Sequence, residues 1–279
     1  MIIPEIKLNS NTETFDYKKA YNECFVNLDV VIDMPEIILG IGSHEYKGKI
    51  YPNPTHTIGE LSAIIAPQKS KKTFYKRATI AAYIGGKSQN YFPNMKSFRK
   101  GEPYILDFDT EQGAYYAQRS FRGVIQMVGA NYANYLPFGL KNLTDEERVL
   151  FIDAVVNDPR YKNKIGLICI DGIADLCTNT NDIEKSKEVA QKIMQWNKNC
   201  HILAVIHKTF EKDKATGHLG TFIQKKCETS IFLKVTDMDT VNSPVEVTQK
   251  DSRGAPFDKF YFNLELSTVT PKECNETNW

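Results

Sequence analysis

The chain has 279 residues, of which 42% are hydrophobic and 25% are charged, a composition typical of a globular protein with one large core. It carries 35 Lys and Arg residues against 34 Asp and Glu residues, which excludes a global positive field and restricts any nucleic-acid contact to a local patch. No apolar run of about 18 residues and no signal-like N-terminus occur, so we expect a cytoplasmic protein without a membrane span.

The N-terminal part of the chain is polar and irregular in pattern. We expect residues 1–58 to form an extension that packs on a single core domain of residues 59–279. Within this extension, residues 30–42 have a strand-like composition that Pro35 interrupts. Residues 43–60 are rich in turn formers, which favours a loop or a hairpin.

From residue 61 onward, short apolar runs alternate with longer amphipathic segments. Strands are predicted over residues 61–66, 104–109, 164–171, 201–207, 229–235, 244–250 and 257–266. Helices are predicted over residues 73–84, 113–128, 144–157 and 183–199. Apolar strands separated by helices predict an α/β fold, in which helices cover both faces of a parallel sheet core. The last three runs have no helices between them, so antiparallel C-terminal strands are expected.

In such sheets the ligand crevice lies at the carboxyl ends of the strands, and the first strand is followed there by a basic loop. The loop consists of Ala66, Pro67, Gln68, Lys69, Ser70, Lys71, Lys72 and Thr73. The common phosphate-binding loop is GxxxxGK[ST], and here Ala66 and Lys71 replace its two glycines while Lys72 and Thr73 are retained.

A helix that starts after this loop would attract anions even without glycine, because its first N–H groups are unsatisfied and its dipole is positive. We therefore expect the loop to bind the phosphates of ATP, and Thr73 to hold Mg²⁺. Lys71 would be costly if the loop needs a positive φ there. The alternative is a solvated basic turn in front of a helix.

Polar side chains also follow the next three strong strands. Glu111 comes just after the second of them, Asp171 ends the third and His207 ends the fourth. A carboxylate at Glu111 can orient an attacking water, one at Asp171 can hold Mg²⁺ opposite Thr73, and His207 can sense the γ-phosphate. The plainer alternatives are a helix cap formed by Thr110 with Glu111, a strand-end cap and a structural histidine. The order of the four positions along the chain favours phosphoryl-transfer chemistry.

These motifs resemble those of the RecA-like P-loop ATPases, in particular the hexameric helicase branch of the RepA and DnaB type. The resemblance covers about residues 59–266 and rests on "IIAPQKSKKT", "ILDFDTEQGAYYAQR", "IGLICIDGIADL" and "ILAVIHKTFEKDKATGHLGT". It implies a RecA-like fold, ATP and Mg²⁺ as cofactors, DNA as partner (single-stranded DNA above all) and a homo-oligomer such as a hexamer. It also implies that His207, Lys208 and residues 217–221 belong to a sensor strand and a DNA-facing loop.

A fifth segment, "VTQKDSRGAPFDKFYF", resembles the late hairpin of that branch, which sends a basic side chain into the ATP site of the neighbouring subunit. Lys250 and Arg253 would be that pair, and the alternative is an exposed turn around Gly254. Two other functions stay open. The altered loop favours a non-hydrolysing binding or scaffold protein, and a different α/β enzyme could bind another anion at the same turn. No aromatic-basic motif for nucleic acid is evident.

Overall fold

The computed structural model describes residues 15–177, 179, 182–208, 215–237 and 242–275. Contacts within the chain define two compact units, Met1–Met34 and Pro35–Trp279. In the first unit, helix α1 (Tyr17–Cys24) begins after Asp16, whose side chain accepts a hydrogen bond from the backbone N–H of Lys19. This helix lies in a segment for which irregular structure was predicted. Its cap and its aromatic residues at four-residue spacing, which contact one another, explain the difference.

In the described part of the chain, the second unit is built on a nine-stranded sheet of order β12-β11-β10-β9-β3-β8-β7-β5-β6. Its strands are β3 (Leu61–Ala66), β5 (Tyr104–Asp109), β6 (Tyr135–Gly139), β7 (Ile165–Asp171), β8 (His201–His207), β9 (Thr229–Val235), β10 (Val245–Ser252), β11 (Phe260–Glu265) and β12 (Thr270–Cys274). The strands from β9 to β6 run parallel, whereas β10, β11 and β12 are antiparallel. The predicted fold class is therefore confirmed.

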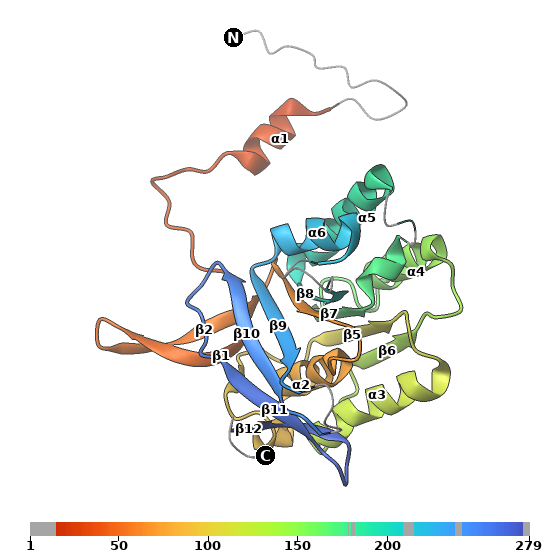
Figure 1. Ribbon diagram of the computed structural model, residues 1–279. Coiled ribbons are helices and arrows are strands. Elements are labelled where there is room, and N and C mark those ends of the chain that lie inside the picture. The colour runs from red at the N-terminus through yellow and green to blue at the C-terminus, as the bar shows by residue number, and fades with distance from the viewer. Residues whose placement is uncertain (1–14, 178, 180–181, 209–214, 238–241, 276–279) are drawn as a thin grey trace. The chain divides into compact units, whose positions relative to one another are not determined.

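Helices cover both faces of this sheet (Figure 1). One face carries α2 (Lys72–Ile84) and α3 (Ala114–Val128), and the other carries α4 (Asp145–Asn157), α5 (Ile183–Trp196) and α6 (Gly217–Lys226). Side chains of β3 alternate between the two faces, so that Ile64 packs under α2 while Ile65 packs against the opposite layer. Within the described residues, no helix combines the length and apolar character needed to cross a membrane.

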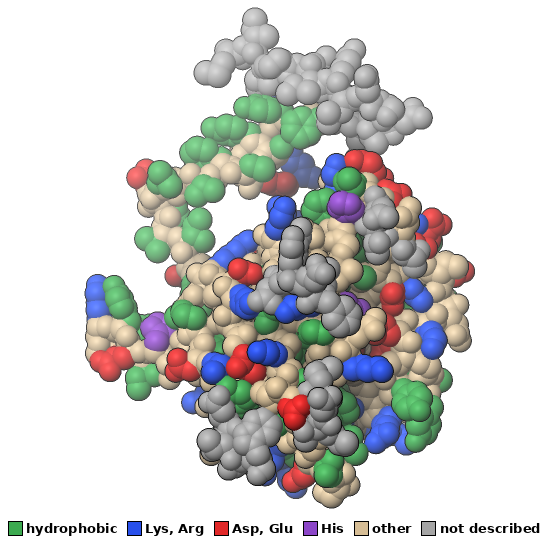
Figure 2. Space-filling view, in the orientation of Figure 1, with side chains coloured by type: hydrophobic (Ala, Val, Ile, Leu, Met, Phe, Trp, Pro, Cys, Tyr) green, Lys and Arg blue, Asp and Glu red, His purple; other side chains and the backbone are tan. Residues whose placement is uncertain are grey.

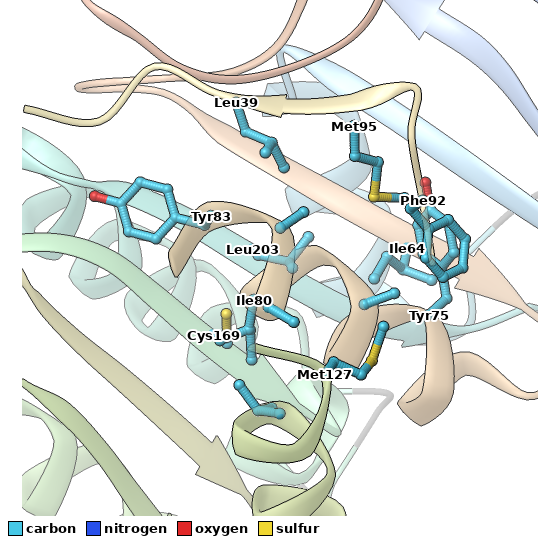
Figure 3. Packing of buried hydrophobic residues seen from close by; sticks show 14 of the residues in the cluster. Leu39, Ile64, Tyr75, Ile80, Tyr83, Phe92, Met95, Met127, Cys169 and Leu203 are labelled. Carbon is cyan, nitrogen blue, oxygen red and sulfur yellow. The ribbon is translucent and has the colours of Figure 1, made fainter. Parts of the chain in front are cut away.

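The core under α2 holds this helix tightly against the sheet. Figure 3 shows Tyr75 and Ile80 of α2 meeting Ile64, Cys169 and Leu203 of the central strands. All five side chains are fully buried. Burial of a large apolar side chain contributes about 1.5–3 kcal/mol, so α2 and the loop in front of it have a fixed position relative to the strand ends.

A smaller sheet of order β2-β1-β4 accompanies the large one in the second unit. It consists of β1 (Ile37–Tyr46), β2 (Lys49–Thr57) and β4 (Met95–Ser97). Between β1 and β2, Lys47 and Gly48 have positive φ angles of 50° and 74°, as a type I′ turn requires. A hairpin is thus the correct choice of the two structures predicted for this segment. Short 3₁₀ helices are η1 (Gly86–Asn90), η2 (Ile173–Leu176) and η3 (Asn197–Asn199).

Besides α1, the elements β4, β6, β12 and α6 differ from the sequence-based expectation. Residues 217–221 were expected to be part of a loop facing DNA, but they form the first turns of α6, because Leu219 and Ile223 pack into the core beside β8. The loop predicted for residues 217–221 was therefore wrong, whereas their contact with DNA stays a prediction, and residues 209–214 of the same segment lie outside the described residues. Strand β6 was missed because it contains Pro137, which is tolerated there since β6 is the edge strand of the sheet.

Two buried histidines lie at the amino end of the parallel strands. The rings of His56 and His201 have centroids 4.6 Å apart, and both residues are fully buried. His201 Nδ1 lies 2.8 Å from the carbonyl of Thr57, which can only accept, so this nitrogen carries the proton. Its Nε2 lies 2.9 Å from the hydroxyl of Ser62. Burial lowers the pKa of His201 to about 3, and burial together with the charge of His201 lowers the pKa of His56.

We predict that these histidines make the protein sensitive to acid. The unfolded state takes up their protons near pH 6.5 and the folded state does not, so each histidine removes up to about 1.4 kcal/mol of stability per pH unit as the pH falls from 6.5 towards 3. Urea unfolding at pH 7, 6 and 5 should give a shallower pH slope for His201→Asn than for the wild type. His218→Asn on α6 serves as the control and should keep the wild-type slope. Equal slopes in all three proteins would contradict the prediction.

Candidate nucleotide site

The four predicted strand ends lie together at one edge of the large sheet. β3, β8, β7 and β5 are consecutive neighbours, and their register pairs Ala66 with His207 and Asp109 with Asp171. Parallel strands end at the same edge, so the loop after β3 and the side chains after β5, β7 and β8 face a common space. This juxtaposition is the geometry that the sequence pattern predicted.

The loop between β3 and α2 has the backbone shape that glycine would normally supply. Lys69 and Lys71 both have a φ of 61°, in the left-handed region, and Lys71 is the N-cap of α2 without any side-chain capping bond. A left-handed residue other than glycine costs about 1–2 kcal/mol, so the rest of the structure imposes this shape on the chain. The Lys71 ammonium donates to the carbonyl of Ser243 at 2.6 Å, which ties it to the β9–β10 connection. Burial lowers the pKa of Lys71.

The other loop residues differ in exposure. Gln68 and Lys69 are exposed, whereas Ser70 is buried with its hydroxyl 3.5 Å from the carbonyl of Gln68. Ala66 is fully buried, and Pro67 is half-buried at the start of the loop. Because Gln68 and Lys69 in the middle of the loop are exposed, an anion can approach the unsatisfied N–H groups in the first turn of α2.

Lys72 connects the loop to the far side of the site. Its Nζ lies 3.3 Å from the carbonyl of Ala66, 2.8 Å from that of Pro67 and 2.9 Å from Nδ1 of His207. An ammonium group only donates, so Nδ1 must accept and the proton of the neutral ring lies on Nε2. That Nε2 lies 2.9 Å from Oε1 of Glu111 and donates to it. Lys72, His207 and Glu111 thus form one chain of hydrogen bonds, with the lysine pKa lowered by burial.

Glu111 is held in place from the backbone side. Oδ1 of the buried Asp109 accepts hydrogen bonds from the N–H groups of Glu111 and Gln112, at 3.1 and 2.8 Å. The hydrogen bond from His207 lowers the pKa of Glu111, so this half-exposed side chain is a carboxylate at neutral pH. An oriented carboxylate beside a phosphate-binding loop is suited to positioning a water molecule.

Thr110 joins the ends of β5 and β7 and does not cap a helix. Its hydroxyl lies 2.9 Å from the carbonyl of Asp171 and 2.8 Å from Oδ2 of Asp175. Helix α3 begins only after Gly113, without a side-chain cap, so the alternative of a cap formed by Thr110 is wrong. Gly172 permits this close approach, because its φ is +88° and a Cβ there would come within 2.2 Å of the Thr110 hydroxyl.

A buried ion cluster lies directly beneath the loop. Oδ2 of Asp171 accepts from the hydroxyl of Thr73 at 3.1 Å and lies 3.2 Å from Nζ of Lys76. The same ammonium is 2.9 Å from Asp107, whose other carboxylate oxygen accepts from the Tyr135 hydroxyl at 2.7 Å. Burial alone would lower the pKa of Lys76, but the aspartates raise it above its ordinary value. Burial also raises the pKa of Asp171, against the opposing charge of Lys76.

Lys76 was not recognised in the sequence, although a signal existed. It lies four residues after Lys72, on the same face of α2, whose first half also carries Arg77 and whose second half is mostly apolar. A lysine in such a position is stable only when a carboxylate is nearby, and three aspartates stand at the ends of β5 and β7.

The side-chain oxygen atoms of Thr73 and Asp171 are suitable ligands for a magnesium ion that would also bind the phosphates of a nucleotide. Hydroxyl and carboxylate oxygens are the ligands that Mg²⁺ prefers. Across the described residues, no group of three or more His, Cys, Asp or Glu side chains is placed to hold a metal by itself. Mg²⁺ commonly uses one or two protein oxygens together with phosphate oxygens, and this site offers that number.

The predicted pair Lys250 and Arg253 lies away from this edge. Arg253 follows β10 and binds both carboxylate oxygens of Glu60 at 2.8 Å, just before β3 begins. Ser252 pairs with Thr229, the first residue of β9, which puts the turn at the amino end of the parallel strands. Nζ of Lys250 lies 4.9 Å from the centre of the Phe232 ring. Neither side chain is close to the phosphate loop of its own chain.

We predict that removing the Lys76 charge destabilises the fold strongly. Lys76→Met leaves two buried carboxylates without their cation and should lower the free energy of unfolding by about 3–5 kcal/mol. Adding Asp107→Asn should restore part of this loss, because it removes one of the two charges. Lys192→Met, which breaks the surface pair with Asp153, is the control and should change stability by about 1 kcal/mol or less. Urea unfolding measures all four proteins, and a Lys76→Met variant as stable as the wild type would refute the role.

We predict that position 71 prefers glycine to alanine. Both substitutions remove the bond to Ser243, but only alanine retains the cost of a left-handed backbone, so Lys71→Gly should be about 1 kcal/mol more stable than Lys71→Ala. At Lys225, within α6, the order should be reversed, because glycine is the poorer helix former. Thermal and urea unfolding test both pairs. The same order at the two positions would argue against strain in the loop.

No protein-family model matches the sequence, and no curated protein matches it. Among solved structures, the chain is similar to the crystal structure of the RadB recombinase, with a TM-score of 0.54 and 12% sequence identity. The match covers 80% of this chain and 94% of the recombinase chain. At this identity the likeness concerns the fold. The protein therefore has the RecA-like fold that its motifs led us to expect.

Proposed function

We propose that the protein is an ATP-binding, Mg²⁺-dependent ATPase that acts on nucleic acid. The observation that carries this proposal is the meeting of Lys72, Thr73, Glu111, Asp171 and His207 at one edge of a RecA-like sheet. The loop and the N-terminus of α2 supply donors for phosphates, Thr73 and Asp171 supply oxygen ligands, and Glu111 supplies a base.

Each side chain has a distinct role in this proposal. Lys72 binds the β- and γ-phosphates, together with the backbone N–H groups of residues 68–73. A bound Mg²⁺, held by Thr73 and Asp171, would neutralise charge on the phosphate oxygens. Glu111 orients the attacking water, and His207 reports on the γ-phosphate through its two hydrogen bonds. Because His207 contacts both Lys72 and Glu111, a phosphate that draws Lys72 away also alters the hydrogen bond to Glu111.

Two parts of the proposal, binding of nucleic acid and assembly into a homo-oligomer, are supported by the likeness to a recombinase and by the sequence motifs. A protein of the hexameric helicase branch would form a homo-oligomer in which Arg253 or Lys250 reaches the ATP site of the next subunit. Their place at the opposite end of the sheet from the phosphate loop is compatible with a contact between copies of the chain. An arginine there would neutralise the developing charge on the γ-phosphate.

A non-hydrolysing nucleotide-binding protein is the second candidate, and Lys72 is the observation that favours it. All three N–H donors of its ammonium are engaged, by Ala66, Pro67 and His207. A phosphate must therefore displace at least one of these partners, which reduces the affinity. Titration with a fluorescent ATP analogue, read together with phosphate release, separates binding from turnover.

We predict that Lys72→Ala lowers ATP turnover at least 100-fold, because the γ-phosphate loses its cationic partner. Phosphate release is measured with Mg²⁺, with and without single-stranded DNA. Lys187→Ala, on the exposed face of α5, is the control and should retain wild-type turnover. Turnover that rises with DNA and disappears in Lys72→Ala is the expected result. Equal turnover in the wild type and Lys72→Ala would disprove the assigned role of the loop.

A further inference from the structure

A second basic site lies between α2, α3 and the turn that joins β11 to β12. A cavity of about 260 Å³ is lined there by Arg77, Arg119 and Arg122, with Tyr115, Gln118, Gly123, Gln126, Thr268 and Val269. No acidic side chain is among these residues. Three guanidinium groups around one cavity repel one another, and the charge of Arg119 contributes, after burial, to lowering the pKa of Arg77 to about 10.

Arg77 has too few partners for a buried arginine. Only 7% of its surface is exposed, and its Nη1 donates to the carbonyl of Val269 at 3.2 Å. Cζ of the same side chain also lies over the ring of Phe74, 4.8 Å from the centre of the ring. Among the described residues, its Nε–H has no acceptor at all. A guanidinium carries five N–H donors, so this group retains capacity for an anion.

The close packing of the two helices holds Arg77 in this position. A Cβ at Gly123 of α3 would come within 2.5 Å of Cζ and Nε of Arg77, so the absence of a side chain there makes room for the guanidinium. Opposite it, Val269 has a φ of 53°, which is strained for a β-branched residue. Residues held in such sparsely populated backbone conformations cluster at active sites and ligand-binding segments.

Helix α3 adds an aromatic side chain to the arginines. Tyr115, Arg119 and Arg122 are spaced four and three residues apart, so they lie along one exposed face of the helix. Tyr115 is 70% exposed. In Figure 2, hydrophobic and Lys or Arg side chains lie side by side over the position of α3. Within the described residues, Arg119 and Arg122 make no hydrogen bond or ion pair. Both are therefore available to an incoming anion.

We propose that this basic cavity, together with Tyr115, binds the phosphodiester backbone of a single-stranded nucleic acid. The arginines would contact phosphates in their planar, bidentate geometry, and the tyrosine would stack on a base. The proposal rests on the proposed function, because it supplies the nucleic-acid surface of that ATPase. It places the nucleic-acid strand on α2 and α3. Helix α2 follows β3 and the candidate phosphate loop, and α3 follows β5 and Glu111.

A larger cavity on the other side of α3 supports the same assignment. It measures about 510 Å³, and Gln118 and Arg122 line both cavities. The rings of Phe121, Tyr132 and Tyr135 contribute to its wall. An aromatic cavity that borders a cluster of arginines offers space for a base next to contacts for its phosphate.

The test uses the full chain and an oligo(dT) labelled with a fluorophore. Fluorescence anisotropy over a range of salt concentrations gives the affinity and its salt dependence for the wild type, the double variant Arg119→Gln with Arg122→Gln, and Arg160→Gln. Arg160 is exposed, is paired with Asp158 and precedes β7, so it controls for the loss of positive charge. Both substituted arginines are exposed, which keeps the fold intact, and the thermal unfolding midpoint verifies this.

The double variant should bind at least tenfold more weakly. The slope of log K against log salt should fall by about 0.7 for each phosphate that the variant no longer neutralises. Arg160→Gln should behave as the wild type. Tyr115→Ser should weaken binding with little change in the salt slope, since stacking releases no counterions.

Two results would overturn the proposal: a wild type that binds no oligo(dT), whether or not it binds inorganic phosphate through these arginines, or a double variant with unchanged affinity and slope. ATP turnover is measured in parallel on the wild type. Binding of oligo(dT) through these arginines without turnover leaves this site standing and refutes the ATPase. ATP turnover together with either of these results leaves the ATPase standing and refutes this site.

Discussion

The ammonium of Lys76 is the charge on which the arrangement of the candidate nucleotide site depends. It lies in the core between Asp107 of β5 and Asp171 of β7, and it fixes the rotation of α2 about its own axis. Because Lys72 lies one helical turn earlier on the same face, this rotation directs Lys72 towards the loop carbonyls and His207. A buried ion pair contributes little net stability, but breaking it is costly, so it specifies one arrangement over others.

The candidate phosphate loop, residues 66–73, depends on the anchoring of α2 by Lys76. Two lysines in its left-handed positions raise its energy by a few kcal/mol relative to glycine, and a free peptide of this sequence would avoid the conformation. The loop is attached on one side to β3 and on the other to α2, and both are buried in the core. Their packing energy exceeds the strain, so the loop keeps its shape without the glycines on which the common sequence pattern relies.

The elements that sequence could predict are those with a strong local pattern. The central strands are continuous apolar runs, and the polar residue after each run marked Glu111, Asp171 and His207 as neighbours once the sheet was assumed. Lys76 and Arg77 gave no comparable signal, because their roles depend on which faces of α2 meet β5, β7 and α3. Residues 217–221 were misjudged because their glycines suggested a loop, while tertiary contacts of Leu219 stabilised a helix.

The two proposed sites share their supporting elements, and this has a thermodynamic consequence. Helix α2 carries Lys72 and Thr73 at its start and Arg77 further along, while α3 follows Glu111 and carries Arg119 and Arg122. A shift of α2 towards a bound phosphate would move Arg77 relative to Gly123, where the helices are too close to slide freely. If nucleotide changes the affinity for a nucleic-acid strand, linkage requires that the strand change the affinity for nucleotide by the same factor. Coupling between the sites would then follow from one rigid helix whose position both ligands constrain.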